Sequence, residues 1–391
     1  MKILMIAPEP IFEPRGTPLS VVGRLKAFSD MGHRVDLLTY SMGEDVVLPG
    51  VRILRIPQLP GIRKVKIGPS FTKIPLDTCL LLKSVVWLLR NRYDLIHTHE
   101  EAGFWGTALS RIFRIPHIYD MHSSLPQQLR NFQFSDSRLL IAVFQKLERW
   151  VLTYSDRVIT ICPDLYEHVR TLLPRKGSVL VENVVDYGMI FGEEDRSSEI
   201  TRSLQLEGRR VVLYTGTFES YQGLDLLILG AEKVVSKIPS VVFLMVGGHP
   251  GQVASYRKKV SERGLDDHFL FTGQVLPQQV GSYIRCADVL ASPRIQGTNT
   301  PLKIYAYLRS GVPVVATRLW THTQVLNDDV AVLTDPTPEA FAEGILTALQ
   351  DRTRSKKLGS RARKLAEKKF SYHVYQEKLH RAIQEATGAG V

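Results

Sequence analysis

Cysteine is scarce in this chain of 391 residues, which contains only Cys79, Cys162 and Cys286. They lie far apart and none belongs to a C-x-x-C pair, which argues against a zinc site or a disulfide framework. Unpaired thiols in odd number are typical of a reducing compartment. We therefore expect a cytoplasmic protein.

Long apolar runs are missing as well. The most apolar stretch, CLLLKSVVWLLRNR, is interrupted by Lys83 and reaches Arg90. It falls short of the ~20 apolar residues that a membrane-spanning helix needs. The first residues, KILMIAP, have the pattern of a strand and lack a secretion signal. We expect neither a secreted nor an integral membrane protein.

Acidic residues are the third deficit, because 50 Lys and Arg stand against 39 Asp and Glu, a net charge of +11. Two stretches hold the surplus: residues 50–92 and residues 352–369 each carry nine basic residues and one acid. Neither stretch contains a nucleic-acid-binding motif, so we expect no nucleic-acid partner.

The two basic stretches differ in composition. Residues 50–92 combine their cations with the apolar segment 80–89, which suits docking on an anionic membrane leaflet. A buried helix with a solvated basic rim explains the same pattern equally well. Residues 352–369 have the composition of a solvated helix. Peripheral contact with the inner face of a membrane through residues 50–92 therefore stays a hypothesis.

Short β-rich runs alternate with helix-length segments in both halves of the chain. The apolar runs, such as DLIHTH and VVFLMVGG, are nearly continuous, as in parallel strands that are buried on both faces. The pattern predicts an α/β protein with two doubly wound domains, residues 1–185 and 209–370. Residues 186–208 are polar and are predicted to be a linker, and residues 371–391 are predicted to form a final helix.

Three strand ends in the first domain carry polar groups. A turn at Gly16 leads into a helix opened by Thr17, where free N–H groups attract anions, although a plain turn explains it as well. His99 ends a strand and is followed by Glu100 and Glu101, and His122 ends the next one. His97 and His99 face the same side, but no third ligand has metal spacing, so we predict no metal site.

The second domain offers a polar loop between a strand and a helix. Hydroxyl groups, free N–H groups at a helix start and two cations make this loop a candidate diphosphate site, although a capped helix with exposed cations fits too. The residues are Arg294, Gly297, Thr298, Asn299, Thr300 and Lys303.

These segments together resemble a known family. In chain order they are the turn at Gly16, GHRVDLLTY, DLIHTHE, the strand end at His122, SDRVITIC and ENVVD, then YTGTFESYQGLDLL, FTGQV, ADVLASP and GVPVVAT. The chain resembles the retaining GT-B glycosyltransferases of the large family 4 over nearly its whole length.

The resemblance implies two Rossmann-like domains that face each other across a cleft, and a last helix that packs back on the N-terminal domain. His122 aligns with the histidine beside the donor sugar, and neither a metal ion nor another cofactor is normally required. The implied donor-binding residues are Gly16, Thr17, Gly216, Thr217, Gln222, Gly297, Thr298, Asn299 and Thr300. The acceptor-side candidates are His99, Glu100 and Glu101.

The chain departs from the family pattern at the donor site. The family usually carries two glutamates where this chain has Thr298 and Ala306, and a lysine where it has Gln222. Arg294 and Lys303 are the natural substitutes for the missing cations, and with His122 they are the expected catalytic residues. We therefore expect a glycosyltransferase that uses a nucleoside-diphosphate sugar and acts with retention. A nucleotide-sugar-binding protein without catalysis, and an epimerase that uses Glu100 or Glu101, remain alternatives.

Overall fold

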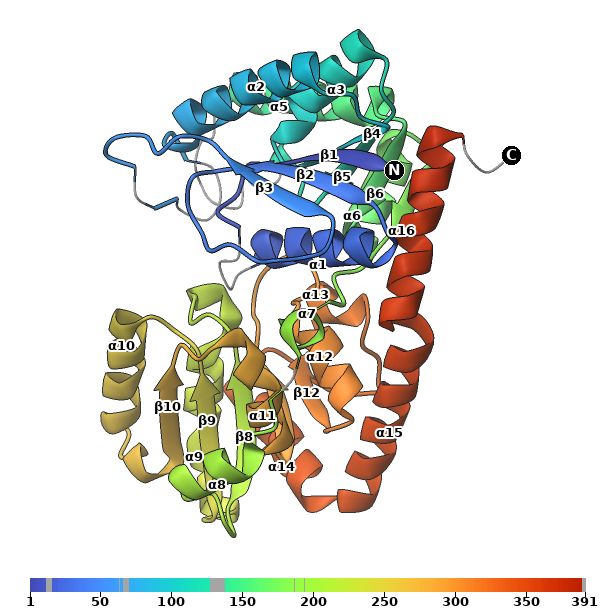
Figure 1. The fold of residues 1–391 in the computed structure, drawn as a ribbon. Coiled ribbons are helices and arrows are strands. Elements are labelled where there is room, and N and C mark those ends of the chain that lie inside the picture. The colour runs from blue at the N-terminus through green and yellow to red at the C-terminus, as the bar shows by residue number, and fades with distance from the viewer. Residues whose placement is uncertain are drawn as a thin grey trace. The chain divides into compact units, whose positions relative to one another are not determined.

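The computed structural model describes residues 1–11, 16–62, 64–65, 70–126, 138–185, 187–192 and 194–388. The chain divides into two units, one formed by Met1–Val185 with Tyr372–Val391 and the other by Asp186–Ser371. Figure 1 shows that each unit is built around a β-sheet of its own. Each unit also has its own hydrophobic core.

The first unit contains a parallel sheet of seven strands in the order β3-β2-β1-β4-β5-β6-β7. The strand order reverses between β1 and β4, and such a reversal creates a ligand-binding crevice at the carboxyl ends of the strands. The strands are β1 (Lys2–Ala7), β2 (Arg34–Thr39), β3 (Val51–Arg55), β4 (Leu95–His99), β5 (His117–Met121), β6 (Arg157–Thr160) and β7 (Ser178–Leu180).

Helices cover both faces of this sheet, which explains why its strands are apolar throughout. Residues Ile3 to Ala7 of β1 are all 0% exposed. The cores place α2, α3, α5 and α6 on one face, whereas α1 and α16 lie on the other (Figure 1). The helices are α1 (Gly16–Asp30), α2 (Lys73–Arg90), α3 (Ala102–Phe113), α5 (Arg138–Tyr154), α6 (Pro163–Leu172) and α16 (Tyr372–Thr387).

The second unit contains a parallel sheet of six strands in the order β10-β9-β8-β11-β12-β13. Here the order reverses between β8 and β11, so the expected ligand crevice lies at the ends of these two strands. The strands are β8 (Arg210–Thr215), β9 (Val241–Val246), β10 (Phe269–Gly273), β11 (Val289–Ser292), β12 (Val314–Thr317) and β13 (Val332–Thr334).

The longer helices of this unit bury apolar faces against the sheet, as Leu227 of α9 and Phe341 of α14 do in the core. The helices are α7 (Tyr187–Phe191), α8 (Ser197–Ser203), α9 (Leu224–Lys237), α10 (Pro250–Ser261), α11 (Val280–Arg285), α12 (Lys303–Ser310), α13 (Trp320–Thr323), α14 (Pro338–Gln350) and α15 (Arg352–Lys369).

Residues 186–208 differ from the linker that the sequence predicts. They belong to the second unit and contain α7 and α8. Ile200 of α8 is buried, and the hydroxyl of Ser282 in α11 accepts from the Arg196 amide at 3.0 Å and donates to the Glu194 carbonyl at 2.6 Å. A polar segment is therefore tied down by backbone hydrogen bonds, which composition does not reveal.

No helix in the described part of the chain is long and apolar enough to cross a membrane.

Gly223 lies where the end of β11 packs tightly on the loop after β8, and a substitution there tests this packing. Its φ is +73°, and a Cβ there would lie 1.9 Å from the Pro293 carbonyl oxygen. Gly208 has nearly the same φ, +74°, but open space around it. We expect Gly208→Ala to lower the free energy of unfolding by about 1 kcal/mol and Gly223→Ala by about 2 kcal/mol more, because of the clash. Urea unfolding measures both, and equal losses would contradict this packing.

Candidate functional site

The first unit gathers three histidines and one aspartate at the ends of β4 and β5. His97 and His99 project to the same side of β4, and Asp120 lies beside His99 in the register of β5. His122 follows β5, and its Nε2 lies 2.9 Å from His99 Nδ1 and 3.3 Å from Asp120 Oδ1. The structure therefore brings two predicted site residues, His99 and His122, into contact.

An ion pair that the sequence analysis missed lies at the base of this group. Arg24 of α1 is completely buried and donates from Nε to Asp120 Oδ2 at 2.7 Å. Its Nη2 donates to the Val181 carbonyl at 3.1 Å. Because both charges are removed from water, each depends on the other for its stability. The alternation Asp-x-His in DMH was the available signal for Asp120, while Arg24 had none.

The histidines of this group are neutral. Burial lowers the pKa of His122 to about 4, against the opposing effect of Asp120, and lowers the pKa of His97 and His99 as well. The pKa of Asp120 lies well below its ordinary value despite burial, because Arg24 and the histidines stabilise the carboxylate. At neutral pH the group thus holds one cation and one anion, which cancel.

His97, His99 and Asp120 also place three ligand atoms within 4.8 Å of one another, close enough for a metal ion. Asp120 is already engaged by the guanidinium of Arg24 at 2.7 Å, and this buried positive charge repels a second cation. The residues present therefore fit a neutral polar centre better than a metal centre.

Glu100 and Glu101 have different environments. Glu100 is buried with a φ of 47° and accepts hydrogen bonds from Ser123 at 2.8 Å and from Thr17 at 3.4 Å. Burial, together with the charge of Glu101, raises the pKa of Glu100. Glu101 instead forms an ion pair with Lys73 at 2.6 Å. Thr17, expected on the donor side, thus contacts an acceptor-side candidate.

Gly16 is the first residue of α1, and the part of the predicted turn at residues 12–15 lies outside the described residues. The Gly16 carbonyl accepts a hydrogen bond from Ser20 at 3.3 Å. The first N–H groups of α1 have no partner inside the helix, as at any helix start.

In the second unit, Lys303 begins α12 beside the end of β8. Its Nζ is shielded from solvent, lies 3.7 Å from the centre of the Tyr214 ring and has no hydrogen-bond partner among the described residues. A Cβ on Gly216 would lie 3.1 Å from Nζ, so the ammonium group packs directly against this glycine. Burial, and then the nearby Arg294, lower the pKa of Lys303 well below its ordinary value.

Arg294 follows β11, and its side chain contacts the loop to which it belongs. Its guanidinium lies 5.2 Å from the centre of the Tyr221 ring and donates to the Gln296 carbonyl at 2.6 Å. Gly297 has a φ of +118°, and a Cβ there would lie 2.2 Å from Arg294 Nη2. Across the described ranges neither Arg294 nor Lys303 forms an ion pair, so two neighbouring cations lack a counter-charge.

The loop between these cations is held by α13 and the residue after it. Thr321 donates to the Asn299 carbonyl at 2.6 Å, and Gln324 donates to the Thr298 carbonyl at 2.5 Å. The Thr300 hydroxyl is buried without a hydrogen-bond partner in the described structure. The loop is thus fixed from behind, which leaves the start of α12 in a defined position.

Gln222, which stands where the family has a lysine, is buried beside the same strand end. Its Nε2 donates to the Thr217 hydroxyl at 3.4 Å, and the Thr217 carbonyl accepts from Tyr214 at 2.6 Å. The predicted donor-binding residues Gly216, Thr217 and Gln222 therefore lie in the same part of the unit as Lys303.

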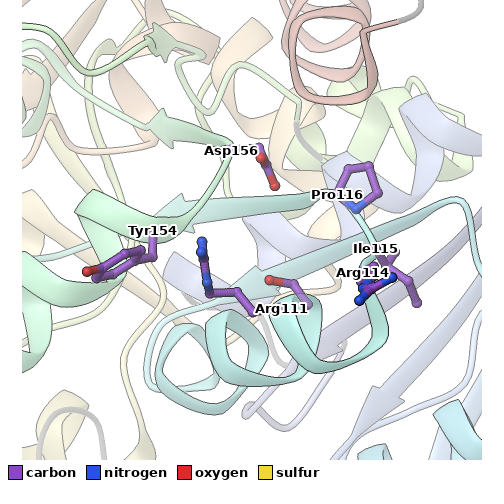
Figure 2. Close-up of a pocket in the computed structure, with 7 residues that line it drawn as sticks. Arg111, Arg114, Ile115, Pro116, Tyr154 and Asp156 are labelled. Atoms are coloured by element: carbon purple, nitrogen blue, oxygen red, sulfur yellow. The ribbon is translucent and has the colours of Figure 1, made fainter.

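A pocket of about 340 Å³ in the first unit belongs to neither group (Figure 2). It lies at the amino ends of β5 and β6, where Arg111 stacks 4.9 Å from the centre of the Tyr154 ring and Asp156 accepts from the His117 amide at 2.8 Å. These polar groups have partners in the unit, and the carboxyl ends of the strands lie at the opposite edge.

The buried ammonium group of Lys303 should lower the free energy of unfolding of the ligand-free protein. We expect Lys303→Met to raise the free energy of unfolding by about 1–3 kcal/mol near neutral pH, because it removes a buried charge without a partner. The gain should shrink as the pH rises toward 10.5, the ordinary value, because the folded protein with its lowered pKa releases the proton before the unfolded chain does. Urea unfolding at neutral and alkaline pH measures this change.

The matched control is Lys259→Met. Lys259 has an acidic partner, Asp225, at 2.5 Å, so its loss should not stabilise the protein. A stability that falls in Lys303→Met as well would show that the ammonium group has a favourable partner.

Two family models match the chain. The model described as "Glycosyl transferases group 1" matches residues 195–365, and the "Glycosyl transferase 4-like domain" matches residues 19–183. Each match falls mainly within one of the two units.

Curated relatives match at low identity. A phosphatidyl-myo-inositol mannosyltransferase of Mycolicibacterium smegmatis is 23% identical over 401 residues, which cover 100% of this chain and 95% of that protein. A 2-deoxystreptamine N-acetyl-D-glucosaminyltransferase of Streptomyces fradiae is 29% identical over 71% of this chain and 69% of its own length. Both relatives are glycosyltransferases by name.

Solved structures show the same fold. Sucrose-phosphate synthase of Thermosynechococcus elongatus superposes with a TM-score of 0.78 at 20% identity and covers 100% of both chains. Anabaena HepE, solved with UDP and glucose, superposes with a TM-score of 0.74 at 20% identity over 98% of this chain and 99% of its own. Among the alternatives left open by the sequence, the comparisons favour an active transferase. The chain belongs to the group 1 glycosyltransferases, enzymes of the family 4 type with the GT-B fold.

Proposed function

We propose that this enzyme transfers a sugar from a nucleoside-diphosphate sugar to a hydroxyl group of a sugar or lipid-linked acceptor, with retention at the anomeric carbon. The observation that carries the proposal is the uncompensated pair Lys303 and Arg294 at the carboxyl edge of the second sheet. A bound diphosphate supplies the opposite charge that the protein itself leaves out. The pair would then change from a cost to stability into a source of binding energy.

The same cations suit the chemistry of the transfer. The bond from the anomeric carbon to the diphosphate oxygen breaks, so negative charge grows on the diphosphate and positive charge on the sugar. A preorganised donor at such a position contributes about 3 kcal/mol to the transition state. The bond to the acceptor oxygen forms on the same face of the sugar, and the acceptor proton passes to the departing diphosphate.

The first unit contributes the neutral imidazole of His122 and the carboxyl groups of Glu100 and Glu101. A neutral imidazole can form a hydrogen bond with a sugar hydroxyl without attracting the diphosphate. The raised pKa of Glu100 lets its carboxyl group donate as well as accept, which suits an acceptor hydroxyl. In this proposal the reaction needs no cofactor, since Lys303 and Arg294 supply the charge that a metal ion supplies elsewhere.

The nucleobase of the sugar donor is the first property to test. Anabaena HepE was solved with UDP and with UDP-glucose, which makes uridine nucleotides the first candidates. Guanosine and adenosine nucleotides serve as comparisons.

Lys303→Met and Arg294→Met should each reduce turnover by about 100- to 1000-fold, because each removes one stabilising charge from the leaving group. They should also lose most of the thermal shift that UDP produces in the wild-type protein. Arg318→Met is the control, because Arg318 is surface-exposed and already paired with Asp328 at 2.7 Å. Near-normal transfer by both variants would contradict the role of these cations.

The membrane hypothesis gains a defined surface in α2. Ile74, Leu82, Val86 and Leu89 are 60%, 61%, 43% and 71% exposed, and their spacing places them along one face of the helix. The opposite face is buried in the core through Leu76, Leu80 and Leu88. An apolar stripe on the solvent side of a packed helix is the feature that an interfacial helix presents to lipid.

Exposed cations adjoin the carboxyl end of this stripe. They are Arg90, the last residue of α2, and Arg92 just after it, with Arg111 and Arg114 at the end of the neighbouring α3. In contrast, Lys73 and Lys83 of the same basic stretch are engaged, the first with Glu101 and the second with the Arg55 carbonyl. Residues 63 and 66–69 of the stretch lie outside the described residues. An apolar stripe with a basic end fits an anionic leaflet, where a lipid-linked acceptor resides.

Leu82→Asp combined with Leu89→Asp should reduce co-sedimentation with vesicles that contain anionic lipid by at least about tenfold, because two apolar contacts become charged. Leu229→Asp is the control, since Leu229 is 44% exposed on α9 of the other unit. Equal binding of the wild-type protein to neutral and anionic vesicles would contradict the role of the arginines, and no binding at all would reject the surface.

A further inference from the structure

We propose that Arg24, Asp120 and Tyr375 are positioning residues that fix the ring of His122, so that the C-terminal helix α16 takes part in transfer through this imidazole. The inference rests on the proposed role of His122 in transfer. It concerns groups within the first unit only, which include α16.

The chain of contacts runs from Arg24 through Asp120 to His122. Arg24 Nε holds Asp120 Oδ2 at 2.7 Å, which fixes the plane of the carboxylate. The other oxygen, Oδ1, lies 3.3 Å from His122 Nε2. A carboxylate can only accept, so this position of Oδ1 favours a proton on Nε2 of His122, with the lone pair on Nδ1.

The neighbouring His99 agrees with this tautomer. Its Nδ1 lies 2.9 Å from His122 Nε2 and can accept from the same N–H group. In this tautomer both groups near the nitrogen act as acceptors. The ring of His122 is held by its Nε2 edge.

Arg24 is itself held from two further directions. Its Nη2 donates to the Val181 carbonyl at 3.1 Å beyond β7. The ring of Tyr375 in α16 lies over the guanidinium, with 5.0 Å between its centroid and Arg24 Cζ. Gly23 makes this approach possible, because a Cβ there would lie 3.1 Å from the Tyr375 hydroxyl oxygen. The C-terminal helix therefore closes the side of the ion pair that α1 and β5 leave open.

The electrostatics give Arg24 a second effect on His122. The charged and titratable groups around the ring are Arg24 from α1, His97 and His99 from β4, Asp120 from β5 and Tyr375 from α16, and all are at most 3% exposed. Asp120 alone would draw a proton onto a neighbouring imidazole, because a lone buried carboxylate stabilises a cation beside it. Burial is the main cause of the lowered pKa of His122, and Arg24 lowers it further and offsets the charge of Asp120, so the ring stays neutral and the two-acceptor arrangement at Nε2 persists.

A double variant distinguishes a role of the Arg24–Asp120 pair in positioning His122 from a role in stabilising the fold alone. Asp120→Asn alone leaves the buried guanidinium unpaired and should lower the stability strongly. Arg24→Met combined with Asp120→Asn removes both charges and should restore most of the lost stability, as replacement of buried ion pairs often does. If the pair is only structural, the double variant recovers kcat along with stability. Under the proposal its kcat stays about 100-fold below wild type, with the donor KM unchanged, because His122 is misplaced.

A control variant and a second test variant show whether a loss of kcat comes from His122 or from a general loss of folding. Arg52→Met combined with Asp36→Asn removes another ion pair of the first unit, 2.8 Å between Nη2 and Oδ2, and should leave kcat near wild type. Tyr375→Leu keeps both charges of the Arg24 pair and removes only the ring over it. This variant should lower kcat by about tenfold through a looser guanidinium, and wild-type kcat here would overturn the role of α16.

Nuclear magnetic resonance of protein with ¹⁵N-labelled histidine tests the inference without any transfer assay. In the wild-type protein, His122, assigned by its loss in His122→Ala, should show the Nε2–H tautomer. The double variant should show a mixture of tautomers. An Nε2–H tautomer that is unchanged in the double variant overturns the inference. The expected tautomer change in a protein without transferase activity would instead reject the proposed function.

Discussion

A charge that is removed from water needs an opposite charge beside it. The first unit supplies this partner within the protein, whereas the described part of the second unit does not. In the first unit Arg24 and Asp120 neutralise each other at 2.7 Å, deep below the strand ends. In the second unit Lys303 packs its ammonium group on the Tyr214 ring, with no acid beside it in the described structure. The first unit is therefore complete without ligand, whereas the second has a charge that only an anion can balance.

In the proposed function, this contrast divides the work of the enzyme between the units. A neutral and tightly bonded group of histidines can orient sugar hydroxyls, since it does not compete for the negative charge of the donor. An uncompensated cation is suited to a leaving group whose charge increases along the reaction. Parallel sheets place both groups at strand ends, because the strands themselves are fully buried and accept few polar side chains.

The sequence was sufficient for the fold and for part of the site. Continuous apolar runs reveal strands buried on both faces, and a polar residue that ends such a run lies at the carboxyl edge of the sheet, as His122 does. Arg24 was not predictable, since a helical arginine normally reaches solvent, and its partner Asp120 is 96 residues away. Tyr375 comes from the far end of the chain. Composition also does not reveal which cations of residues 50–92 are paired, and the structure pairs Lys73 with Glu101 and Arg52 with Asp36.

The departures from the family pattern become coherent when the position of Lys303 is considered. Gln222 stands where the family has a lysine, and it is buried with its amide on the Thr217 hydroxyl, so no cation can extend from there. Lys303 comes from a different loop, yet its ammonium group packs against Gly216, in the same loop after β8 that contains Gln222. Lys303 thus places a positive charge beside the same loop in which the family pattern has its lysine. Decay of a donor site would remove a cation without replacing it, whereas this chain keeps a buried ammonium group at the end of β8, where a bound anion would supply the missing opposite charge.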